Sequence, residues 1–305
     1  SGNVGRSQEV YFTVDAVADD ITPPFLTVFS PLNNSFHTSE ILLNVSSNEN
    51  LSSASYSLDG AVNVSLDNVS GVLWNSSIKP VQGRYSIVFY GEDGAGNVGK
   101  SLPHFFTFDN SSPRYFGTGV SSPVWDNSSE TCFSFWEDNI GLGTGVVGVN
   151  SSGSFVNHSF GMSGTSSYLN YSFSPSELEP GSLECRFWMN DTSGNSNFTS
   201  VDFQVLDKTS PFFYNVSNSP FSERDMDPGV MITVEADVVD YNVSDVKLQY
   251  GNSSSYFTNV SMVNVDGDTF QANFTPVSED LWFYRIFAQD SSGNVNFSEV
   301  FELSV

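Results

Sequence analysis

The chain has 305 residues, of which 10 are Lys or Arg and 35 are Asp or Glu, so its formal net charge is −25. Such a charge repels phosphate backbones and anionic lipid surfaces, which argues against nucleic acid as a partner and against membrane contact within this segment. Within these 305 residues we find no apolar run of 18 or more residues that could cross a membrane, and no recognisable signal peptide.

A glycine-asparagine pair recurs along the chain and sets its period. The pairs end at Asn3, Asn97, Asn195 and Asn294, which are 94, 98 and 99 residues apart. A period near 100 residues is typical of β-sandwich domains and too long for a short solenoid repeat. Because no strand precedes the first pair, we expect three whole copies and one leftover strand.

The copies share one order of features. A Thr-Pro or Ser-Pro pair opens each copy, then come a β-rich run, a hairpin, and an apolar strand that leads into D-x-x-G-N. Helical signals are almost missing, and we expect only a single turn at 174–182, which Pro180 closes. The expected hairpin turns are pairs that tolerate positive φ: Asp59-Gly60, Ser152-Gly153 and Gly251-Asn252. The expected divisions are 1–20 for the surplus strand and 21–110, 111–208 and 209–305 for three domains.

The apolar strand before D-x-x-G-N alternates in the way that a core strand does. Its inward residues are expected to be Tyr85, Ile87 and Phe89, then Leu183, Cys185 and Phe187, then Trp282, Tyr284 and Ile286. The aspartate that follows is Asp93, Asp191 or Asp290. Its carboxylate can accept hydrogen bonds from backbone amides two residues on, which favours a role in the turn over a role as a calcium ligand.

Both cysteines, Cys132 and Cys185, lie in the second copy. In a Greek-key sandwich their strands face each other across the core, and a disulfide there would stabilise the fold by roughly 4 kcal/mol. Two buried free thiols are the alternative. Simple alternation from the other copies puts Phe133 and Phe135 inward and Cys132 outward. Either the second copy is shifted by one residue or the disulfide does not form.

The turns EDGAGN, NDTSGN and QDSSGN, each between two strands, make the chain similar to the immunoglobulin-like repeats of prokaryotic cell-surface proteins. The resemblance covers nearly the whole chain. It implies an all-β fold of three tandem immunoglobulin-like (Greek-key) β-sandwich domains plus one surplus N-terminal strand. The motif is typical of a fold and indicates no activity.

The sequence is also rich in N-x-S/T, the acceptor motif for N-linked glycans. The chain has 28 Asn, and 19 of them stand in this motif, against about 6 for independent placement. A Ser- and Asn-rich chain could accumulate such motifs by chance, but several recur at equivalent outward places, such as Asn75, Asn170 and Asn273. The candidate glycosylation sites are Asn33, Asn44, Asn50, Asn63, Asn68, Asn75, Asn110, Asn127, Asn150, Asn157, Asn170, Asn190, Asn197, Asn215, Asn242, Asn252, Asn259, Asn273 and Asn296.

Dense N-glycosylation belongs outside the cell, so we expect an extracellular, cell-surface location. An acidic, sequon-dense and cysteine-poor array most closely resembles archaeal surface glycoproteins.

Catalytic and metal-binding motifs are weak. His37, His104 and His158 are scattered, with no H-E-x-x-H or G-x-S-x-G, so the chain is not expected to be an enzyme. Calcium is the one cofactor considered, because carboxylates crowd two linkers without a shared D-x-D spacing; solvated charge is the default. The weak candidates are Asp15, Asp19 and Asp20 in the first linker and Glu223, Asp225 and Asp227 at the start of the third copy.

The leading hypothesis is a structural rod of immunoglobulin-like domains in a glycosylated surface filament, stalk or sheath. Its expected partners are other copies of itself and its N-linked glycans. The alternatives are an adhesin or receptor array, and the noncatalytic arm of a secreted hydrolase. Residues 4–14 match the final strand of each copy, so they are expected either to pair with another subunit as a donor strand or to be the end of a preceding repeat.

Overall fold

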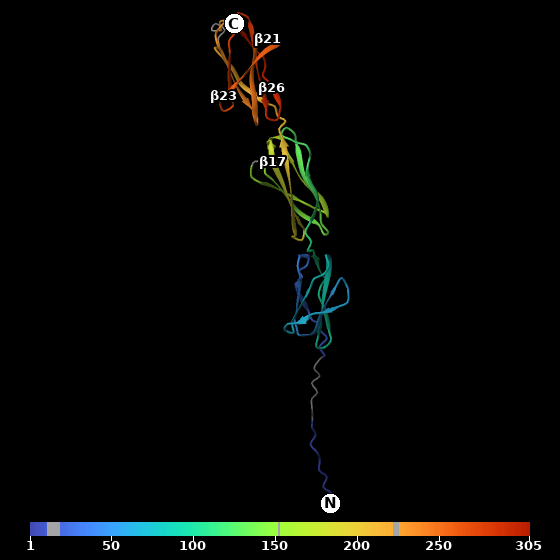
Figure 1. Cartoon of the computed structure of the whole chain (residues 1–305). Coiled ribbons are helices and arrows are strands. Elements are labelled where there is room, and N and C mark those ends of the chain that lie inside the picture. The colour runs from blue at the N-terminus through green and yellow to red at the C-terminus, as the bar shows by residue number, and fades with distance from the viewer. Residues whose placement is uncertain (11–18, 152, 222–225) are drawn as a thin grey trace.

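The computed structural model describes residues 1–10, 19–151, 153–221 and 226–305. Within these ranges the strands form sheets that pack in pairs, and each pair encloses one hydrophobic core. We call the pairs the first, second and third sandwich. They follow one another end to end (Figure 1). The all-β fold expected from the sequence is confirmed.

The first sandwich packs a sheet ordered β1-β3-β7-β6 against one ordered β2-β10-β8-β4-β5, with β9 paired to β8. Alternation buries Leu43 and Val45 of one sheet against Ile87 and Phe89 of the other. The strands are β1 (Leu26–Ser30), β2 (Ser35–His37), β3 (Ile41–Ser47), β4 (Leu51–Leu58), β5 (Val64–Ser65), β6 (Asp67–Asn68), β7 (Leu73–Ile78), β8 (Gly83–Asp93), β9 (Val98–Lys100) and β10 (His104–Phe108).

The second sandwich packs β11-β13-β16 against β12-β18-β17-β14-β15. As in the first, the chain changes sheets early, because β12 pairs with the last strand in parallel just as β2 does. The single turn expected at 174–182 is the 3-10 turn η1 (Pro175–Glu177). The strands are β11 (Arg114–Val120), β12 (Val124–Trp125), β13 (Glu130–Glu137), β14 (Leu142–Val149), β15 (Val156–Gly161), β16 (Ser166–Phe173), β17 (Gly181–Asp191) and β18 (Ser196–Leu206).

The third sandwich packs β19-β20-β24-β23 against β22-β21-β25-β26, with β27 paired to β25. The strands are β19 (Phe212–Ser219), β20 (Ile232–Val239), β21 (Val243–Ser253), β22 (Tyr256–Ser261), β23 (Val263–Asp266), β24 (Thr269–Phe274), β25 (Leu281–Asp290), β26 (Val295–Phe297) and β27 (Phe301–Ser304).

The cysteines resolve the conflict over register in the second sandwich. Cys132 and Cys185 are both fully buried, their Cα atoms are 6.6 Å apart, and their sulfur atoms are bonded. Phe133 and Phe135 are only half-buried and lie on the outer face of β13. The second copy is therefore shifted by one residue, and the inward placement of the two phenylalanines was wrong.

Two of the expected hairpin turns can be compared with the structure in full. Asp59 and Gly60 form their turn with φ of 50° and 74°. The turn expected at Gly251-Asn252 is wrong, because β21 continues through both residues and the chain reverses between β21 and β22. The strand continues because Tyr250 and Gly251 pair with Tyr284 and Phe283 of β25.

The structure does not test the role predicted for the N-terminal segment. Residues 1–10 belong to none of the described strands, and residues 11–18 lie outside the described residues. Pairing of residues 4–14 with another subunit stays a prediction. That each sandwich folds as an independent domain also stays a prediction.

Candidate metal centre

The D-x-x-G-N turn lies late in each copy, but it places a carboxylate at the end of the sandwich where the incoming chain enters. In the first, Asp93 ends β8, and its Oδ1 accepts hydrogen bonds from the backbone N–H groups of Ala95 and Asn97 at 2.8 and 2.9 Å. Asp191 accepts both equivalent bonds in the second sandwich, and Asp290 accepts the one from the Asn294 N–H group in the third. The turn-forming role expected from the sequence is therefore present, and the hydrogen bond from the Asn97 side chain lowers the pKa of Asp93.

The asparagine of the same turn binds the segment that leads into the sandwich. Asn97 Nδ2 donates to the carbonyl oxygen of Asp20 at 2.9 Å, and Asn195 Nδ2 donates to that of Asp109 at 3.0 Å. Asn294 Nδ2 repeats the contact with Asp207 at 3.3 Å. The recurring glycine-asparagine pair thus fixes the incoming chain against each sandwich.

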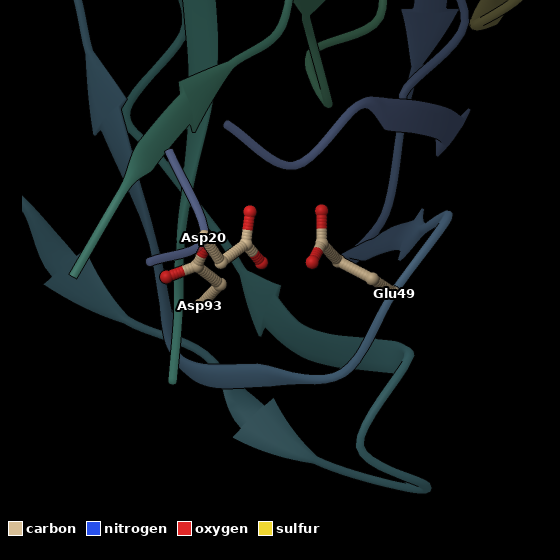
Figure 2. Close-up of side chains that lie close together, drawn as sticks. All are labelled: Asp20, Glu49 and Asp93. Carbon is tan, nitrogen blue, oxygen red and sulfur yellow. The ribbon is translucent and has the colours of Figure 1, made fainter. Parts of the chain in front are cut away.

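This arrangement gathers three carboxylates at each junction, in what we call the junction clusters. The incoming segment supplies one, the loop after β3, β13 or β20 supplies the second, and the D-x-x-G-N turn supplies the third. In each cluster one oxygen from every residue lies within 4.8 Å of the others. Figure 2 shows the carboxylates of Asp20 and Glu49 facing each other, with Asp93 beside Asp20. The clusters are Asp20, Glu49 and Asp93; Asp109, Asp138 and Asp191; and Asp207, Asp240 and Asp290.

The second and third clusters each contain one buried carboxylate oxygen without a hydrogen-bond partner. Asp109, Asp138 and Asp191 are all buried, and Oδ2 of Asp138 is buried with no hydrogen-bond partner; Oδ2 of Asp240 is in the same state. Burial, followed by the charges of the neighbouring carboxylates, raises the pKa of Asp109. The same causes raise the pKa values of Asp207 and Asp240. Buried carboxylates that lie side by side, with one oxygen left unpaired, are costly unless a cation joins them.

A calcium ion fits this donor set. Calcium prefers carboxylate and carbonyl oxygens at about 2.3–2.6 Å, so two oxygens on one ion lie at most about 5 Å apart. The clusters meet that limit, and neither of the two ion pairs found among the described residues uses a junction carboxylate. The arrangement can therefore hold a hard divalent cation between the incoming chain and two loops of the next sandwich.

Of these nine carboxylates, the sequence indicates Asp20 as a weak calcium candidate. It also allows the three turn aspartates as calcium ligands but favours their role in the turn. Asp15, Glu223 and Asp225 lie outside the described residues, while Asp19 and Asp227 are exposed and outside the clusters. A search for a local D-x-D spacing missed the rest, because each loop supplies one carboxylate. The available signal was the recurrence of single acidic residues at the repeat period, as in Glu49, Asp138 and Asp240.

The candidate glycosylation sites all reach the surface. Fourteen of the 19 asparagines are exposed, and the five half-buried ones are Asn44, Asn75, Asn150, Asn197 and Asn296. The histidines remain separate: His37 contacts Ser35, His104 contacts the carbonyl of Pro31, and His158 packs on Tyr171. Among the described residues no helix is both long enough and apolar enough to span a membrane.

Neither a protein-family model nor a curated protein matches the chain. Solved structures do. A tetra-tandem repeat from the extending region of a large adhesion protein is 14% identical, with a TM-score of 0.41, and the match covers 92% of this chain and 74% of that one. A Ca²⁺-stabilised adhesin of an Antarctic bacterium is 11% identical, with a TM-score of 0.35, over 93% and 73% of the two chains. The fibronectin(III)-like modules of Clostridium thermocellum CbhA are 15% identical, with a TM-score of 0.35, over 60% and 95%.

Proposed function

We propose that this chain is a structural segment of an extracellular, N-glycosylated surface or filament protein, in which calcium at the junctions makes successive sandwiches into a rod. The observation that carries the proposal is the recurrence of one carboxylate cluster at the start of all three sandwiches. A rod needs stiff joints, and a cation bound by the incoming chain and by two loops restricts bending between neighbours.

Direct contacts support the same role at the junction between the first and second sandwiches. Gln82, in the loop before β8, accepts a hydrogen bond from the Asn139 side chain at 2.8 Å. Its amide donates to Asn110 of the linker, also at 2.8 Å. These polar contacts are few, so the ion would be the main restraint on bending.

Surface chemistry supports the extracellular part of the proposal. The 19 sequons are spread over all three sandwiches, and none of their asparagines is buried. Intact mass spectrometry of the secreted protein should show several attached glycans. A mass equal to that of the bare chain would contradict the glycoprotein assignment and leave the junction proposal standing.

Calcium should raise the thermal stability of the chain. Extracellular calcium modules bind with Kd of about 10⁻⁴–10⁻³ M, so 10 mM Ca²⁺ should stabilise each ion-binding sandwich by roughly 1.5–3 kcal/mol, or roughly 6–20 °C in Tm. Calorimetry in EDTA and in Ca²⁺ measures this shift. Small-angle scattering should show a larger radius of gyration with Ca²⁺. An unchanged Tm on adding Ca²⁺ to the wild-type chain would refute the metal site.

Asp138→Asn separates an ion ligand from an ordinary structural residue. In EDTA the variant should be as stable as wild type or more stable, because it removes an unpaired buried charge. In Ca²⁺ the second sandwich of this variant should gain little of the stabilisation that calcium gives to wild type. Asp202→Asn, on the exposed side of β18 in the same sandwich, is the control and should keep the full calcium response. Equal responses of the two variants would contradict the assignment.

A further inference from the structure

An aromatic patch covers part of the outer face of the β11-β13-β16 sheet in the second sandwich. Phe135 packs on Tyr168 with ring centroids 4.9 Å apart, and Phe133 lies 6.4 Å from the same tyrosine. Tyr168 is 61% exposed, and the two phenylalanines are half-buried. Clustered aromatic rings on an outer sheet face usually have something to cover them.

A sequon asparagine stands inside this patch. Asn170 lies directly opposite Phe133 in the β13-β16 register and two residues from Tyr168, on the same face of β16. Side chains in directly opposite positions have Cβ atoms about 4.5–5.5 Å apart. On the far side of Phe133 is Gly119, whose lack of a side chain leaves room for the ring. Asn170 is exposed, and its side chain makes no hydrogen bond to the described residues.

The equivalent sequons in the other sandwiches have polar surroundings. Asn273 lies opposite Thr233, and the neighbouring Gln271 donates a hydrogen bond to Glu235. Asn75 lies opposite Asn44 on β3 and Asp67 on β6. Three asparagines at one place in the repeat therefore differ in their neighbours, and only Asn170 has aromatic rings beside it in its ladder.

We infer that the first sugar attached to Asn170 packs over Phe133 and Tyr168 and stabilises the second sandwich. This inference rests on the proposed glycosylation. A pyranose ring has a face of C–H groups that suits the negative face of an aromatic ring, and its hydroxyls can point to water. Since the sugar is covalently attached beside the rings, it reaches them at a high effective concentration. A glycan at the centre of the patch also obstructs any protein that would dock there.

The test compares matched sequons in a host that attaches N-glycans, with site occupancy checked by mass spectrometry. Asn170→Gln should lower the Tm of the second sandwich by roughly 4–8 °C. Asn273→Gln should move the Tm of the third by less than 1 °C, because no aromatic ring lies beside Asn273 in its ladder. In a host that adds no glycans, Asn170→Gln should leave the Tm unchanged.

A second measurement tests the contact itself. Tyr168→Ser should lower the Tm of the glycosylated chain by more than it lowers the Tm of the Asn170→Gln chain. In NMR spectra the protons of the first sugar should show upfield ring-current shifts, and Tyr168→Ser should abolish these shifts. If a glycan is found at Asn170 but Tyr168→Ser lowers the Tm equally in both chains and the sugar protons show no shifts, the inference is overturned while the proposed glycosylation stands. A bare Asn170 would overturn it together with the glycosylation of this site. Self-association of Asn170→Gln at unchanged Tm would overturn it in favour of an interface between copies.

Discussion

At the scale of single residues, asparagine has several roles in this chain. Asn195 and its equivalents hold the incoming segment, whereas Asn170 is exposed beside aromatic rings. Asn197 and Asn296 belong to a further class. Both stand in sequons, yet their side-chain amides donate to the carbonyls of Pro113 and Pro211 at 2.8 Å. Counting N-x-S/T motifs treats these asparagines alike. Only their hydrogen bonds distinguish the asparagines with a structural role from those whose side chains are free to accept a glycan.

Asn197→Ala should therefore destabilise the second sandwich with or without glycans. Losing a half-buried hydrogen bond to a backbone carbonyl costs about 0.5–1.5 kcal/mol. Urea unfolding of the unglycosylated chain measures the loss. Asn252→Ala, at an exposed sequon on β21, should change the stability by less than about 0.5 kcal/mol. Equal effects of the two changes would argue against a structural role for Asn197.

Tyr171 and Glu177 should give the second sandwich a pH dependence at both ends of the scale. Burial and the hydrogen bond to Glu177 raise the pKa of Tyr171 to about 12, and the same bond lowers the pKa of Glu177. The tyrosine's contribution is complete below pH about 10 and is lost as the pH rises toward 12. The glutamate's contribution is present above its unfolded pKa and is lost as the pH falls through its lowered one. Tyr171→Phe should flatten both limbs of a Tm-pH profile, and unchanged limbs would contradict this.

At the scale of secondary-structure elements, one position of the repeat contacts the incoming chain through a glycine in the first sandwich and through an asparagine in the other two. Gly99 of β9 lies so close to the carbonyl of Pro24 that a Cβ atom would overlap it. Two residues after the glycine-asparagine pair in the other sandwiches stand Asn197 and Asn296, whose side chains bind a proline carbonyl. The incoming chain therefore lies closer to the sheet in the first sandwich.

Gly99→Ala should push the incoming segment away from β9 and cost about 1–3 kcal/mol. Denaturant unfolding of the first sandwich measures this cost. Gly83→Ala on β8 of the same sandwich is the matched control, because a Cβ atom there would make only ordinary contacts with the Tyr85 ring, at 3.6 Å. A loss no greater than in the control would show that the segment shifts freely.

The strands show which parts of the fold the sequence can predict. Alternation correctly places Ile87, Phe89 and Phe187 in the core because each strand has one face toward the opposite sheet. It failed for Cys132, because an offset of one residue between copies reverses every side chain of a strand. It also missed that β21 continues through Gly251-Asn252, since pairing with β25 outweighs the local preference for a turn.

At the scale of the whole molecule, three separate cores should unfold as separate events. Because the disulfide joins residues of the second sandwich only, replacing Cys132 and Cys185 with Ala should destabilise that sandwich by about 2–5 kcal/mol. Calorimetry should show one transition moved and two unchanged. A shift of all three transitions together would mean that the sandwiches unfold as one cooperative unit.

The junction clusters were largely beyond single-sequence prediction for a reason that also belongs to this scale. Their carboxylates come from three segments of each copy, and Asp109, Asp138 and Asp191 lie tens of residues apart. Only the fold brings them together. The sequence showed the recurrence of Asp191, but its hydrogen bonds in the turn accounted for that recurrence without an ion.

The position of the junction aspartates has a consequence for how such arrays can change in length. Asp109 and Asp207 follow the last strands of the first and second sandwiches, and each completes a cluster whose other members belong to the following sandwich. The first and second sandwiches are therefore each followed by the aspartate that completes the next cluster, and the second and third each supply the two loops that receive it. Duplication or deletion of a whole repeat again brings such an aspartate to two matching loops. Arrays of this kind can therefore gain or lose modules by recombination without a new joint having to evolve.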